Sequence, residues 1–104
     1  MDMIGLVEGS FEWALMYLKH GSRIRRKGWE NKEAFLYLTT GLKVPTDDLR
    51  TDTSYNLFGN NKSNDIKTVK INSHIDMRIS ADNILIGWSP DQIDMITNDW
   101  EILK

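Results

Sequence analysis

The chain has 104 residues, of which 40% are hydrophobic and 27% are charged, and it contains no cysteine. This length predicts one domain (residues 1–104) with one modest core, and it disfavours multidomain enzymes, coiled-coil rods and disordered tails. With a formal net charge of −2, the chain as a whole has no positive electrostatic field that would attract nucleic acid. The absence of cysteine excludes disulfides, cysteine-ligated zinc and thiol chemistry.

The N-terminal residues 1–5 carry an acid where a secretory signal would carry a base. No apolar run in the sequence approaches the roughly 20 residues of a membrane span. The absence of cysteine fits a reducing compartment. We therefore expect a soluble, cytoplasmic protein.

The sequence predicts a helix over residues 10–20, which begins at the capping residue Ser10 and ends before Gly21. One apolar face of this helix is formed by Phe11, Ala14, Leu15 and Leu18. A second apolar side is formed by Trp13, Met16 and Tyr17. We expect this second side to contact another subunit, because a small core cannot cover both.

Two strands are predicted next, over residues 22–26 and 33–39, with a turn between them. The second strand is largely apolar on both faces, which is typical of a central or interface strand. Residues 43–65 then show no sustained period and contain four Asn and four Asp. We interpret them as a variable surface insert; its large apolar residues Tyr55, Leu57 and Phe58 would also suit a ligand lid or a partner contact.

Regular patterns return after the insert. Strands are predicted over residues 66–71 and 74–80, followed by a short apolar run over residues 83–88 and a closing strand over residues 100–103. These elements complete an α+β fold: a small antiparallel sheet with an N-terminal helix and a short C-terminal helix.

The short C-terminal helix is predicted from Ser89-Pro90-Asp91-Gln92. Ser89 is the expected cap, Pro90 the first helical residue and Gln92 the capping-box partner. Ile93 and Ile96 are then expected to face the core. The free amides at this helix start, with Trp88 beside them, could hold an anion, although every capped helix has such an end.

Residues 19–27 hold five of the thirteen basic residues and no acid. They could bind phosphate, with Trp29 as a surface for base stacking. They could equally pair with the acidic residues near the C-terminus, which are Asp91, Asp94, Asp99 and Glu101. On charge alone the second interpretation is favoured.

Strand alternation separates Arg26 from its basic neighbours. If Ile24 faces the core, Arg26 faces it too, while Arg23 and Arg25 point outward. An inward arginine needs a partner, because an unpaired buried charge costs several kcal/mol. The candidate partners are an internal carboxylate, such as Asp76 or Asp94, and a ligand phosphate. Both would apply in a polar cleft where the carboxylate orients Arg26 toward the ligand.

The sequence contains few patterns that are typical of enzymes. The two histidines lie far apart, and no HExxH pattern, glycine-rich phosphate loop or nucleophile elbow is present. We therefore expect no catalytic residues, no metal ligands and no cofactor. One alternative is a small hydrolase that uses Asp76 and Asp94 as a carboxylate pair. Another is a protein-interaction adaptor whose tryptophans form the interface.

The joint order of the motifs resembles a known family. A helix ending in Lys19-His20-Gly21 precedes Arg26-Lys27-Gly28-Trp29, and after the insert come His74-Ile75-Asp76-Met77, residues 88–95 and Asp99-Trp100-Glu101. This order resembles the small phage and prophage family represented by Thoeris anti-defence protein two, once known only as a domain of unknown function. The resemblance covers about residues 10–42 and 71–103.

Members of that family are described as sponges rather than enzymes. They bind the cyclic ADP-ribose signal of a bacterial TIR-domain protein and so deprive the downstream effector. The resemblance implies a homotetramer with ligand pockets between protomers, in the bacterial cytoplasm, with neither nucleic acid nor membrane as a partner. It implies sequestration of glycocyclic ADP-ribose without cleavage; some relatives also bind other cyclic nucleotides.

A pyrophosphate, an adenine and two riboses require an arginine, aromatic faces and carboxylates or amides. Within the matching motifs the expected ligand-binding residues are Arg26, Trp29, Asp76, Trp88, Ser89, Gln92 and Asp94. Trp100 is assigned to the core. The chain departs from the family pattern at Glu30, which precedes Asn31 where the family has Asn directly after the first Trp, and in its longer insert. Both departures bear on ligand choice.

Overall fold

The computed structural model describes residues 5–59 and 66–104, which form two compact units. The first unit comprises residues 5–39 and 74–104, and the second comprises residues 40–59 and 66–73. Within these described ranges no helix is both long and apolar enough to span a membrane.

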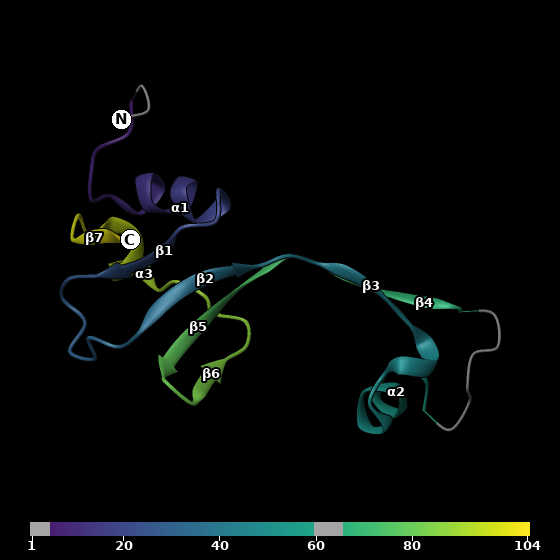
Figure 1. The fold of residues 1–104 in the computed structure, drawn as a ribbon. Helices are drawn as coiled ribbons and strands as arrows, with labels where there is room; N and C mark the ends of the chain where they lie inside the picture. Colours follow the sequence, from purple (N-terminus) through teal and green to yellow (C-terminus); the bar gives the residue numbers. More distant parts are fainter. Residues whose placement is uncertain (1–4, 60–65) are drawn as a thin grey trace. The chain divides into compact units, whose positions relative to one another are not determined.

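The first unit is built from two helices and five strands, in the order shown in Figure 1. They are α1 (Phe11–Lys19), β1 (Arg23–Arg26), β2 (Phe35–Thr39), β5 (His74–Ser80), β6 (Asn83–Leu85), α3 (Gln92–Ile96) and β7 (Trp100–Leu103). The strands form one sheet in the order β6-β5-β2-β1-β7, and every neighbouring pair is antiparallel. The predicted α+β class, with an N-terminal and a short C-terminal helix, is confirmed.

The register of the sheet defines its two faces. Ile24 of β1 lies opposite Leu36 of β2 and Ile102 of β7, and Leu36 lies opposite Met77 of β5. Directly opposed residues point to the same side, so these side chains share one face. Helix α1 packs on this face against β1, β2 and β7, and also contacts α3 (Figure 1). We call it the helix-covered face.

The core forms between α1 and this face of the sheet. Its buried members are Trp13, Ala14, Leu18, Ile24, Leu36 and Trp100. The expectation that Trp13 would contact another subunit is wrong, because its side chain is only 7% exposed and belongs to the core. Because α1 contacts both the sheet and α3, more than one side of the helix is buried.

The ends of α1 follow the sequence signals. The Ser10 hydroxyl accepts a hydrogen bond from the Trp13 amide (3.2 Å), and Gly21 after the helix has a φ of 100°. Just before the helix, Gly9 also has a positive φ, and a Cβ there would lie 2.5 Å from the Asn98 carbonyl oxygen. Glycine therefore allows the N-terminal segment to approach β7, where the Gly9 carbonyl accepts from the Trp100 amide.

Helix α3 begins later than predicted. Its cap is Asp91 rather than Ser89: the Asp91 carboxylate accepts from the Asp94 amide, and the Asp94 carboxylate accepts from the Asp91 amide. Aspartate caps a helix as well as serine does, and Asp91 is followed three residues later by Asp94, which completes the capping box. Ile93 and Ile96 are 61% and 77% exposed, so the expectation that they face the core is wrong.

The second unit contains most of the region interpreted as an insert. It contains β3 (Leu42–Pro45), a 3-10 turn η1 (Thr46–Asp48), α2 (Thr51–Phe58) and β4 (Thr68–Ile71). Strands β3 and β4 pair antiparallel, with Val44 opposite Val69, so regular structure occupies much of the 43–65 region; residues 60–65 lie outside the described residues. Tyr55 and Leu57 of α2 are more than half exposed.

Candidate functional site

The basic strand β1 lies beside the acidic residues near the C-terminus, because β1 pairs with β7. Arg25 Nε lies 3.1 Å from Glu101 Oε2. Arg26 Nη1 lies 2.9 Å from Asp94 Oδ1, and Arg26 Nε lies 2.9 Å from Asp99 Oδ1. The pairing interpretation of the basic stretch is therefore confirmed for these two arginines.

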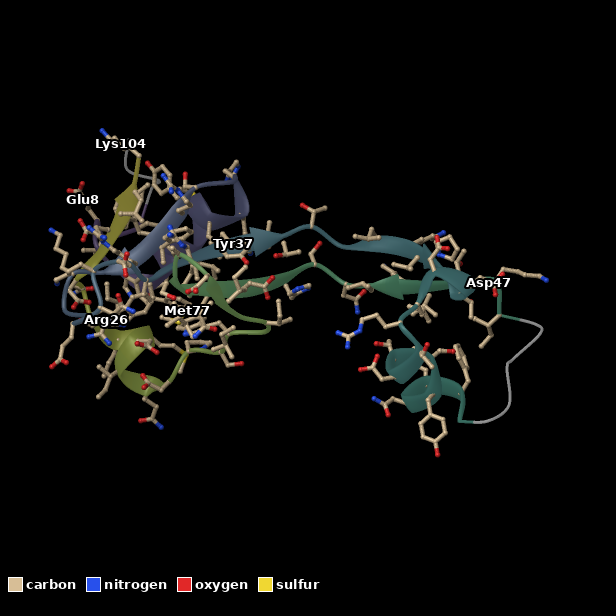
Figure 2. The ribbon with its side chains drawn as sticks, turned by 60° about the horizontal axis from the view of Figure 1, so that its bottom comes forward. Glu8, Arg26, Tyr37, Asp47, Met77 and Lys104 are labelled. Carbon is tan, nitrogen blue, oxygen red and sulfur yellow. The ribbon has the colours of Figure 1, made fainter. Side chains whose placement is uncertain are left out.

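Arg26 faces inward, as strand alternation predicts, and Figure 2 labels it beside α3. Its expected partner Asp94 is confirmed, Asp99 is a second partner from the acidic residues expected to pair with the basic stretch, and Asp76 lies elsewhere. Three of the five guanidinium N–H donors reach these two carboxylates. Asp99 sits in the turn before β7, and the β1–β7 register, which places Arg26 opposite Trp100, brings it to Arg26.

The ion pairs of Arg26 shift the pKa values of their members in the direction that favours the charged forms. Hydrogen bonding to Asp99 raises the pKa of Arg26, against the opposing effect of burial and with a further contribution from Asp94. The same bond lowers the pKa of Asp99, aided by the Thr97 hydroxyl and the Gly28 amide, which also donate to that carboxylate. Arg26 and Asp99 therefore stay ionised around neutral pH.

Four aromatic rings, which we call the aromatic cluster, lie next to the ion pairs. Trp100 is buried, and its indole Nε1 donates to the Asp94 carbonyl (2.8 Å). The rings of Phe11, Trp29 and Trp88 have centroids 5.4, 5.6 and 6.2 Å from that of Trp100. The core position of Trp100 is confirmed. Trp29 and Trp88 are half-buried, so each presents part of its ring to solvent.

Asp76 lies on the other face of the sheet. It is opposite Tyr37, next in sequence to Met77, which points to the helix-covered face. Its carboxylate accepts from the Thr39 hydroxyl and the Gly87 amide and lies 3.2 Å from His74 Nε2. Burial acts to raise the pKa of Asp76, but these hydrogen bonds outweigh it and leave the pKa lowered.

The last two expected site residues are exposed. Ser89 precedes α3, and Gln92 is its first residue. The Asp91 carboxylate already occupies the Asp94 amide at this helix start. The structure thus brings Arg26, Trp29, Trp88 and Asp94 together around Trp100, with Ser89 and Gln92 at the adjoining surface. Asp76 points to the other face of the sheet and accepts from Gly87, the residue before Trp88.

Comparison with known proteins covers nearly all of the chain. The Thoeris anti-defense 2-like domain matches residues 9–103. A Thoeris anti-defense 2 protein of Bacillus phage SP01 is 33% identical over 95 residues, which are 91% of this chain and 94% of that protein. The chain belongs to the Thoeris anti-defense 2-like family. Membership makes it an anti-defense protein of the Thoeris type.

The geometry of this Thoeris anti-defense 2-like chain bears on the hydrolase alternative. Asp76 and Asp94 lie in separate hydrogen-bond networks, on opposite sides of the sheet. A general acid at neutral pH needs a raised pKa, whereas the pKa of Asp76 is lowered. Within residues 5–59 and 66–104, no group of three His, Asp or Glu side chains is placed to hold a metal ion.

Asp76→Asn is expected to remove part of the acid sensitivity of folding. Since the folded pKa of Asp76 is depressed, its contribution to stability is present above the ordinary carboxyl pKa and is lost as the pH falls through the folded value. Urea unfolding of both proteins from neutral pH down to below about pH 4 measures this. The wild-type advantage should shrink in acid; an advantage independent of pH would contradict the assignment.

Proposed function

We propose that this chain binds and sequesters a cyclic ADP-ribose-type immune signal, glycocyclic ADP-ribose, in the bacterial cytoplasm without cleaving it. Such a sponge would prevent activation of the Thoeris effector. Family membership supports the anti-defense role. The observation that favours binding over cleavage is the separation of Asp76 from Asp94, because neither carboxylate is free to act as an acid beside the other.

The proposed ligand contacts follow from chemistry. The N–H donors of Arg26 that do not reach a carboxylate suit a phosphate, and the half-exposed rings of Trp29 and Trp88 suit an adenine. The exposed amide of Gln92 and the hydroxyl of Ser89 suit ribose hydroxyls.

Asp76 requires a different account. It points to the sheet face opposite Arg26, so a pocket that contains both side chains could form between two copies. This supports the proposed homotetramer with pockets between protomers. The same arrangement would let a chain of 104 residues enclose a dinucleotide-sized molecule by sharing walls.

Native mass spectrometry with and without cyclic ADP-ribose-type nucleotides tests uptake. We expect a tetramer that gains the mass of bound ligand. Gln92→Ala should reduce uptake while leaving the tetramer intact, because Gln92 is exposed. Glu12→Ala, an exposed residue in the first turn of the other helix, is the matched control and should take up ligand like the wild type. A protein that gains no mass would be an adaptor rather than a sponge.

A further inference from the structure

The loop between β1 and β2, residues 27–34, carries Trp29 and is attached to the rest of the fold at both ends (Figure 1). At its start, the Gly28 amide donates to the Asp99 carboxylate (3.0 Å), which ties the loop to the turn before β7. Its far end is attached by a different residue, Asn31, which is not among the proposed ligand contacts.

Asn31 uses both ends of its side-chain amide. Its Nδ2 donates to the Ile79 carbonyl of β5 (2.7 Å), and its Oδ1 accepts from the Glu33 amide (3.0 Å). The second bond reaches two residues along the chain, as in an Asx turn, and the Asn31 carbonyl also accepts from the Ala34 amide (3.2 Å). One side chain therefore both folds the end of the loop and attaches it to the sheet.

The acceptor is available because β5 is irregular at Ile79. The β2–β5 register ends at Arg78, and the β5–β6 register passes from Arg78 directly to Ser80. Ile79 therefore has no opposite residue in either neighbouring strand of the described sheet. A bulge of this kind leaves the extra residue outside the ladder of hydrogen bonds. The side chain of Asn31 supplies a donor to its carbonyl in place of a strand neighbour.

Trp29 lies between the two attachments of the loop. Its amide donates to the Arg26 carbonyl (3.2 Å), and its ring centroid lies 5.6 Å from that of Trp100. The ring is half-buried, so the position of its exposed part depends on where the loop holds the backbone. The bond from Asn31 to β5 resists movement of the loop away from the sheet.

We propose that Asn31 is a positioning residue for Trp29: its bond to the Ile79 carbonyl holds the loop so that the exposed part of the Trp29 ring can stack on the adenine of the nucleotide. A ring that is already held in place loses less freedom on binding than a mobile one, which favours affinity. The inference rests on the proposed function for its ligand, whereas the placement of the ring is testable without one.

Fluorine NMR of the protein labelled with fluorotryptophan tests the placement of the ring. The Trp29 signal is identified by its loss in Trp29→Phe. Asn31→Ala should shift or broaden this signal and leave that of the buried Trp13 in place. Asn83→Ala is the matched control, because Asn83 is an exposed asparagine beside the same bulge, opposite Ser80. It should leave the Trp29 signal unchanged.

Titration with glycocyclic ADP-ribose tests the consequence for binding. Asn31→Ala should weaken binding about fivefold, the size expected for one lost hydrogen bond. Asn31→Asp keeps the acceptor for the Glu33 amide but loses the donor to Ile79, so it should weaken binding at least as much. In a Trp29→Ala background, Asn31→Ala should cause no further loss, because both substitutions act through the same ring.

An unchanged Trp29 signal in Asn31→Ala would overturn the proposal. Equal movement of the Trp13 signal would overturn it too, since Asn31 would then act on the fold as a whole. Undiminished binding by Asn31→Ala, or the same fivefold loss in the Trp29→Ala background, would also contradict it. Failure of the wild type to bind glycocyclic ADP-ribose would instead contradict the proposed function, while a moved Trp29 signal in Asn31→Ala would still support the placement.

Discussion

Arg26→Ala is expected to lower the free energy of unfolding by roughly 3 kcal/mol, the loss typical of breaking a buried ion pair from one side. The substitution leaves the carboxylates of Asp94 and Asp99 without their shared cation, and all three side chains are less than a third exposed. The Asp94 carboxylate also completes the capping box of α3, so its displacement should loosen that helix. Urea unfolding at neutral pH measures the change.

Two further substitutions separate charge from geometry. Arg26→Lys keeps the cation but loses the fork that reaches both carboxylates, so its stability should fall between wild type and Arg26→Ala. Arg25→Ala breaks a more exposed pair and should cost less than about 1 kcal/mol. An Arg26→Ala protein as stable as the wild type, yet unable to bind nucleotide, would reassign Arg26 from a structural role to ligand binding alone.

Trp100→Ala is expected to cost about 3–5 kcal/mol, as for other large aromatic side chains removed from a core. Trp100 is nearly fully buried, contacts three aromatic rings and donates its indole N–H to the Asp94 carbonyl. Since domains of this size have only about 5–15 kcal/mol of stability, much of the total would be lost. Thermal and urea unfolding followed by circular dichroism measure it.

Trp29→Ala is the matched comparison. Trp29 touches the same ring as a half-buried neighbour, so its removal should destabilise the protein clearly less than Trp100→Ala does. Equal losses for the two variants would contradict the assignment of Trp100 as the centre of the aromatic cluster. Retained stability in Trp29→Ala would also make that variant usable in ligand-binding experiments.

Local signals in the sequence predicted much of the fold. Ser10 and Gly21 correctly predicted the two ends of α1, because capping depends on a few adjacent residues. Strand alternation placed Arg26 on the same side as Ile24, because the two-residue period of a strand is local too. The start of α3 differs from the prediction because two cap patterns overlap there, and the reciprocal hydrogen bonds form between Asp91 and Asp94 rather than from Ser89.

Features that depend on contacts between residues distant in sequence could not be predicted from such local patterns. Strand β3 pairs with β4 across α2, so its regularity comes from a partner beyond the apparent insert. Asp99 reaches Arg26 only through the β1–β7 register. Trp13 looked surplus to a small core because the packing of α1 against β1, β2, β7 and α3 is not visible in any one segment.

The candidate site was predicted in its residue types more successfully than in its arrangement. Arg26, Trp29, Trp88 and Asp94 do lie around one buried tryptophan. Asp76 lies on the opposite face because it alternates with Met77 in β5, which a list of motifs does not reveal. Asp76 and Asp94 therefore lie in separate hydrogen-bond networks and do not form the carboxylate pair of the hydrolase alternative.

Recovery of the signal after binding tests the central claim most directly. The purified protein is mixed with glycocyclic ADP-ribose until effector activation is lost, then denatured by heat, and the supernatant is analysed by mass spectrometry and by the same effector assay. We predict that the intact signal returns in full and activates the effector again. Recovery of a cleaved nucleotide, with no return of activity, would contradict sequestration and identify the protein as a hydrolase.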